Sequence, residues 1–147
     1  MNLDTLDKRY ELVKEMLDKA FIINRELSEL SEGNKDYDND WAGVEITLDN
    51  LTAIKEMMCV EEIFLDAFDE MQEVRTADRD EKESFIGIFY LDGLNVFNQE
   101  VLMPRLKHAK ENLDNWGFRT EEGKEFYEEF SAKVNALIKK YDGLYDV

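Results

Sequence analysis

Hydrophobic residues recur every three or four positions along most of the chain, which is the spacing of one face of an α-helix. The clearest run is residues 51–74, LTAIKEMMCVEEIFLDAFDEMQEV. Its apolar side comprises Ile54, Met57, Met58, Val60, Ile63, Phe64, Ala67, Phe68, Met71 and Val74. Strict alternation of apolar and polar residues is absent, so a β-strand fits poorly. The run predicts a central helix that starts near Asp49 or Asn50, either of which is a good N-cap.

Two flanking segments show the same pattern. Residues 3–31 predict a first helix, in which acidic and basic residues alternate on the outer side. Residues 120–141 predict a last helix, with Thr120 as its N-cap, glutamates in its first turn and lysines in its last turn. Both ends of this last helix suit the helix dipole.

The segment 79–115 permits two interpretations. It is apolar nearly all round and contains Pro104, so we expect a buried helix that is interrupted. The alternative is a β-hairpin over residues 85–97, because Asp92-Gly93 between apolar runs is a strong turn signal. The helix is preferred, since no other strong strands are present to complete a sheet.

Residues 31–47 form the longest stretch that we expect to be irregular. Asp36, Asp38 and Asp40 alternate there and Trp41 follows directly, which predicts an acidic loop. We expect the Trp41 indole to pin this loop to the core, and the alternative is an exposed indole that anchors a partner. An EF-hand that begins at Asp36 or Asp38 would not supply both the required glycine and the final glutamate. We therefore predict no calcium site in this loop.

These elements predict an all-α fold. The whole chain, residues 1–147, is expected to form one four-helix-bundle-like domain with a long acidic loop between the first two helices. The alternative is an α+β domain with the hairpin at residues 85–97.

Charge narrows the choice of partners. The chain carries a formal net charge of −17, and residues 36–83 alone hold 16 acidic and 4 basic side chains. Free nucleic acid and anionic membrane surfaces both need clustered Lys and Arg, so neither is an expected partner. No apolar run is long enough to span a bilayer, and we expect a cytoplasmic protein. The single cysteine, Cys59, excludes an intramolecular disulfide and is expected to be a buried thiol.

The polar side of the central helix is almost purely acidic, with no basic residue between Lys55 and Arg75. Like charges four residues apart destabilise a helix by roughly 0.2–0.5 kcal/mol per pair, which favours a role in binding. We predict a partner-binding surface that also includes the acidic loop: Glu62, Asp66, Asp69, Glu70, Glu73, Asp36, Asp38, Asp40 and Trp41.

Catalytic chemistry is nearly absent from the sequence. His108 is the only histidine and is expected to be a solvated surface residue, and no Glu-x-x-His pair is present for a di-iron site. Glu70-x-x-Glu73 and Glu125-x-x-Glu128 could together hold Mg²⁺, as in all-α nucleotide hydrolases, but any acidic helix yields such pairs by chance. We predict no catalytic residue, no metal and no cofactor.

Three functions fit these features. The first is a module that neutralises a basic protein such as a nuclease or a DNA-binding protein, acting as an immunity protein or as a nucleic-acid-mimicking inhibitor. The second is a structural or adaptor domain without enzymatic activity, whose acidity serves solubility. The third is a Mg²⁺-dependent nucleotide hydrolase. We expect a monomer or a weak homodimer.

Overall fold

The computed structural model describes residues 3–78 and 90–146, without the side chains of residues 73–78. Within these residues the structure contains no strand and is dominated by long helices, so the predicted all-α, bundle-like fold is confirmed. The elements are α1 (Leu6–Leu30), α2 (Lys35–Asp78), the π-helix η1 (Asn98–Leu102), α4 (Met103–Trp116) and α5 (Glu121–Tyr141).

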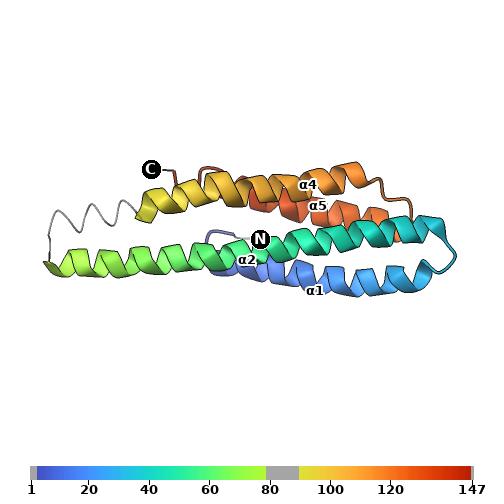
Figure 1. Ribbon diagram of the computed structural model, residues 1–147, viewed down its shortest axis with the longest axis horizontal. Helices are drawn as coiled ribbons and strands as arrows, with labels where there is room; N and C mark the ends of the chain where they lie inside the picture. Colours follow the sequence, from blue (N-terminus) through green and yellow to red (C-terminus); the bar gives the residue numbers. More distant parts are fainter. Residues whose placement is uncertain (1–2, 79–89, 147) are drawn as a thin grey trace.

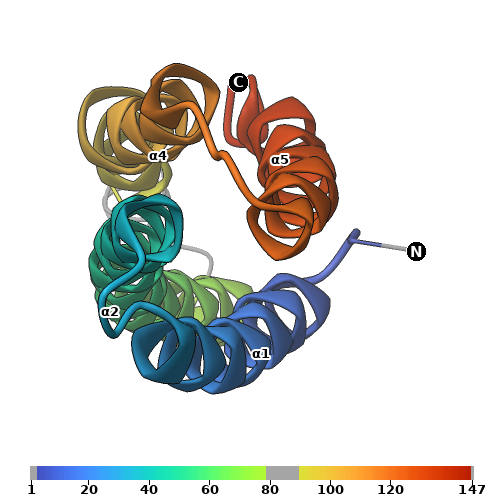
Figure 2. The same cartoon turned by 90° about the vertical axis from the view of Figure 1, so that its right-hand side faces the viewer.

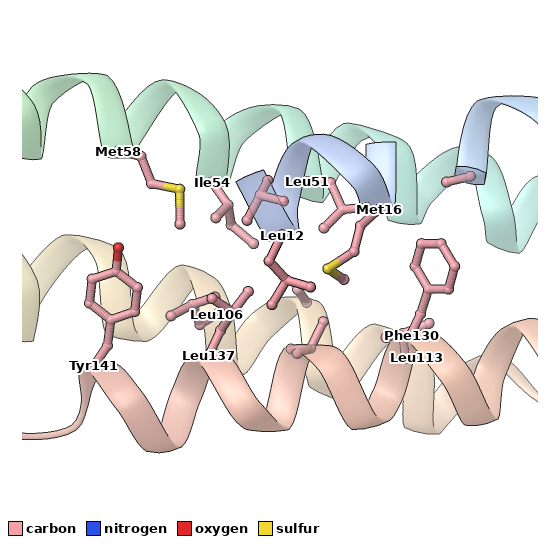
Figure 3. Close-up of a cluster of buried hydrophobic side chains, with 14 of the residues drawn as sticks. Leu12, Met16, Leu51, Ile54, Met58, Leu106, Leu113, Phe130, Leu137 and Tyr141 are labelled. Atoms are coloured by element: carbon pink, nitrogen blue, oxygen red, sulfur yellow. The ribbon is translucent and has the colours of Figure 1, made fainter. Parts of the chain in front are cut away.

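The helices lie side by side along one long axis (Figure 1) and follow the order α1, α2, α4, α5 around it (Figure 2). α1 packs along α2, α2 along α4 and α4 along α5, whereas α1 and α5 approach each other less closely. α2 is the longest, at 44 residues, which corresponds to about 66 Å. Apolar side chains fill the interior (Figure 3): Leu12, Met16, Leu51, Ile54, Met58, Leu106, Leu113, Phe130, Leu137 and Tyr141 are all buried.

The ends of the helices follow local chemistry. The Thr5 hydroxyl accepts a hydrogen bond from the Lys8 amide at 3.3 Å and caps α1. Thr120 caps α5 as predicted, by accepting from the Gly123 amide at 3.0 Å. α4 ends at Gly117, whose φ of 72° is the left-handed conformation that glycine adopts without steric cost.

The predicted acidic loop is wrong, because this segment is the first part of α2. Only residues 31–34 connect the two helices, and the predicted start of the central helix is too late in the chain. Asn34 Oδ1 accepts a hydrogen bond from the Asp36 amide at 3.2 Å, as an N-cap does. Asp36 and Asp38 then lie in the first turn, where the helix dipole stabilises negative charge.

The third segment is an interrupted helix, as predicted, over the residues that the structure describes. Residues 90–97 are helical and continue through η1 into α4. Pro104 lies in the first turn of α4. Proline has no N–H to donate, and its ring crowds the carbonyl four residues earlier, that of Glu100. The wider π turn of η1 accommodates both effects. The hairpin alternative is wrong for residues 90–97, and residues 85–89 lie outside the described part.

Candidate partner-binding surface

The outer face of α2 is acidic along most of its length. Among the α2 side chains that the structure describes, Lys35 is the only exposed base, while nine acids are exposed: Asp36, Asp38, Glu45, Asp49, Glu56, Glu62, Asp66, Asp69 and Glu70. Six of these acids lie on one face of the helix. Together with Thr52, Cys59 and Ile63 they follow one another along the sequence in steps of three, four or seven residues. We call these six the acidic stripe: Asp38, Glu45, Asp49, Glu56, Asp66 and Glu70. It extends about 48 Å along the helix.

The acidic face predicted for the central helix is exposed wherever its side chains are described. Asp66 and Glu70 belong to the acidic stripe, and Glu62 and Asp69 flank it. The side chain of Glu73 lies outside the described part of the chain. None of the four described carboxylates forms an ion pair with another described residue, so their charge is not neutralised within that part of the protein.

The remaining predicted residues lie at the start of α2 and have different surroundings. Asp36 is exposed, and its Oδ1 lies 3.6 Å from Arg119 Nη1 at the surface. Asp38 is exposed and begins the acidic stripe. Trp41 is partly buried and packs against the hydrophobic core, so the prediction that its indole pins this segment to the core is confirmed.

Asp40 is buried, and its assignment to an acidic surface is therefore wrong. Its carboxylate accepts hydrogen bonds from the amides of Arg119 at 2.9 Å and Thr120 at 2.8 Å, and a short one from the Thr120 hydroxyl. A methyl group at Gly123 would overlap Asp40 Oδ2. Asp40 thus ties α2 to the beginning of α5, and its charge is compensated by donors inside the protein.

A second buried carboxylate, Glu61, was missed by the sequence analysis. Its Oε1 lies 2.6 Å from Arg9 Nη2, with 0% and 3% of the two side chains exposed. The Tyr145 hydroxyl donates to the same oxygen at 2.7 Å, and the Arg9 guanidinium lies 4.5 Å above the Tyr141 ring. These contacts join α1, α2, α5 and the C-terminal segment in one internal cluster.

The tyrosines of this cluster stay protonated. Burial, reinforced by the negative charge of Glu61, raises the pKa of Tyr141 and Tyr145 far above the ordinary value near 10. Both hydroxyls therefore remain neutral at physiological pH. The cluster is an internal ion pair with neutral neighbours, and it adds no charge to the outer face of α2.

Cys59 is exposed, so the prediction of a buried thiol is wrong. It lies on the line of the acidic stripe, next to Ile63, whose side chain is also strongly exposed at 67%. The exposed surface of α2 thus presents a free thiol and the apolar side chains of Val60 and Ile63 among carboxylates.

The two glutamate pairs considered for Mg²⁺ are not brought together. Glu125 lies near the start of α5, which contacts Asp40 of α2. Glu70 lies about 45 Å farther along α2 than Asp40, so it is far from Glu125. Within the described residues, no group of three or more Asp, Glu, His or Cys side chains could hold a metal ion.

His108 is exposed, as predicted, and its Nε2 lies 3.3 Å from Asn112 Nδ2. The segment tested as a calcium-binding loop is helical and therefore lacks the loop geometry of an EF-hand.

No protein-family model, curated protein or solved structure matches this chain. Among the described residues, no helix has the length and apolar character needed to cross a membrane. Function is therefore inferred from the chemistry of the acidic surface alone.

Proposed function

We propose that this protein is an acidic protein-binding module that neutralises a basic partner through the outer face of α2. The observation that supports this proposal is the row of exposed carboxylates on α2, of which Glu62, Asp66, Asp69 and Glu70 have no counter-ion among the described residues. Glu62–Asp66 and Asp66–Glu70 are like-charge pairs four residues apart, and each destabilises the helix by roughly 0.2–0.5 kcal/mol.

Charge elsewhere in the bundle is balanced differently. On α5, Glu129 accepts hydrogen bonds from Lys19 at 2.6 Å and from Lys133 at 2.9 Å. On α4, Lys110 pairs with Asp114 one turn away. Carboxylates without an ion pair also occur on α1 and α5, but exposed bases accompany them there: Lys8, Lys14, Lys19 and Arg25 on α1, and Lys124 and Lys139 on α5. Among the described side chains of α2, only Lys35 is an exposed base, and acidity that served only solubility would not require such a lack of bases on one helix.

The charge density favours a strongly basic protein surface as the partner. Residues 62–70 place four exposed carboxylates within about 12 Å. The three intervals between them average about 4 Å along the helix axis, comparable to the spacing of about 3.4 Å per phosphate along one DNA strand. A nuclease or another DNA-binding protein presents a basic groove that would accept such a row, so an immunity protein or a nucleic-acid-mimicking inhibitor is the functional class we propose.

We further propose that the protein is cytoplasmic and acts as a monomer. A single exposed thiol, Cys59, suits a reducing compartment. A net charge of −17 opposes close association of two copies.

Two experiments test the proposal. The protein is used as bait in an extract of its native host, and captured proteins are identified by mass spectrometry and remeasured as purified pairs. We expect a basic partner whose affinity falls steeply as the salt concentration rises. A structural or adaptor domain would give no such salt-dependent partner, and a Mg²⁺-dependent hydrolase would instead bind Mg²⁺ in calorimetry.

A further inference from the structure

The interface between α1 and α5 is hollowed, and one of its hollows differs from those beside α2–α4 and α4–α5 because several glutamates surround it. α1 and α5 are the neighbours that approach each other least (Figure 2), and two hollows of about 210 and 230 Å³ lie between them. Lys19 donates hydrogen bonds to Glu129 across this interface, at 2.6 and 2.7 Å, and forms part of the lining of the first hollow.

The first hollow has an apolar floor and an acidic rim. Ile23, Leu27 and Leu30 of α1 and Phe126 of α5 form the floor. Leu30 is 48% exposed, so part of this apolar lining is open to solvent.

Four glutamates surround this floor: Glu26, Glu122, Glu125 and Glu129. Glu129 is paired with Lys19 and Lys133, and these hydrogen bonds lower the pKa of its carboxyl below the ordinary value. The other three carboxylates have no ion pair with a described residue, so the rim is negative.

The size and charge of the hollow restrict its occupant. About 210 Å³ is below the range of about 300–1,000 Å³ that is usual for small-molecule sites, and it suits one large apolar side chain. A second copy of this chain would place acidic helices against acidic helices. The second hollow of the interface is lined by Lys133 and by no carboxylate, so it does not share this charge pattern.

We propose that the hollow between α1 and α5 binds a basic amphipathic helix of a partner protein, with one large apolar side chain on the floor and lysine or arginine side chains on the glutamates. This is helix-in-groove recognition with an apolar anchor inside a charged rim. The hollow shares no residue with the acidic stripe, so this docking site is separate from the surface proposed above.

The probe is a synthetic helical peptide of leucine and lysine with one tryptophan on its apolar face. Because Trp41 and Trp116 of the protein also emit, binding to the full chain is followed by the fluorescence anisotropy of a fluorescein label on the peptide at physiological salt. The test variant combines Leu30→Lys with Glu125→Lys. The control combines Phe21→Lys with Glu29→Lys, which makes the same two kinds of change at exposed positions of α1 outside the hollow. Circular dichroism checks that both variants are folded.

We expect the test variant to bind the peptide about tenfold more weakly or worse, and the control to bind as the unaltered protein does. A peptide with glutamate in place of lysine should not bind. The inference is overturned if the leucine–lysine peptide does not bind, if both peptides bind equally, or if the two variants weaken binding equally. If only the Asp66→Lys, Glu70→Lys variant loses binding of the peptide, the hollow is rejected as the binding site and the acidic surface of α2 is supported instead.

Discussion

Glu61 of α2 holds Arg9 of α1 in an ion pair of 2.6 Å that is buried inside the bundle, 52 residues apart in the chain. Removing both charges from water is costly, and the pair offsets this cost through its short contact and the hydrogen bond from Tyr145. We therefore expect the pair to fix the register of α1 against α2 more than it adds net stability, because an apolar pair of similar volume could fill the same space.

Breaking this pair on one side should therefore be severe. We expect Arg9→Met or Glu61→Leu alone to lower the free energy of unfolding by about 3–5 kcal/mol, because each leaves a buried charge without its partner. The double variant should recover most of that loss in urea unfolding. Lys140→Met, which removes an exposed pair with Asp4, is the control and should cost less than about 1 kcal/mol. A double variant as unstable as the sum of the single variants would contradict this account.

The buried tyrosines make stability sensitive to alkaline pH. The pKa of Tyr141 and Tyr145 is raised in the folded state, so above the ordinary value near 10 only the unfolded chain releases these protons. Their contribution is fully present below that value, and the free energy of unfolding should fall as the pH rises beyond it. Tyrosinate absorbance should show the last ionisations coinciding with unfolding, and Tyr145→Phe should flatten the alkaline decline. Full ionisation of all tyrosines in the folded protein would disprove this prediction.

Asp38 and Asp40 are two residues apart, yet they should behave in opposite ways. Asp40→Ala removes the acceptor for two amides and a hydroxyl and should lower the free energy of unfolding by about 3 kcal/mol. Asp38→Ala should cost less than about 1 kcal/mol, because this exposed carboxylate interacts mainly with the helix dipole. Gly123→Ala should resemble Asp40→Ala, since the methyl group would overlap that carboxylate. Thermal unfolding of the three variants distinguishes these cases. Equal stability of Asp40→Ala and Asp38→Ala would be inconsistent with the buried position of Asp40.

The start of α2 could have been predicted from its apolar positions. Tyr37, Trp41, Val44, Leu48 and Leu51 follow one another in steps of four and three, which is the spacing of a packed helix face. The alternating aspartates suggested a loop instead. Aspartate is equally favoured in the first turn of a helix, so the apolar spacing was the more informative signal.

Helical phase also indicates which polar residues point inward. Glu61 follows Met58 by three residues and Ile54 by seven, so it shares their buried face, while Cys59 falls on the outer face. Phase alone does not identify the partner, because Arg9 is 52 positions away from Glu61. Such distant pairings depend on how the helices pack, which local spacing does not determine.

Reversing two charges of the acidic stripe tests whether its acidity serves a partner. In the Asp66→Lys, Glu70→Lys variant, attractive pairs with Glu62 and Asp69 replace repulsive ones. We expect the free energy of unfolding to rise by up to roughly 1 kcal/mol. Binding of the basic partner should weaken, mainly through a slower association rate that depends less on salt.

The matched control for this experiment is Glu11→Lys with Glu15→Lys on α1. These glutamates are also exposed and four residues apart, so the net charge changes equally while the acidic stripe is untouched. If only the α2 variant loses the partner while remaining folded, the position of the charges decides binding. If both variants weaken binding equally, net charge alone is responsible. A partner whose affinity and salt dependence are indifferent to the α2 reversal would show that the carboxylates of residues 62–70 are only a solvated surface.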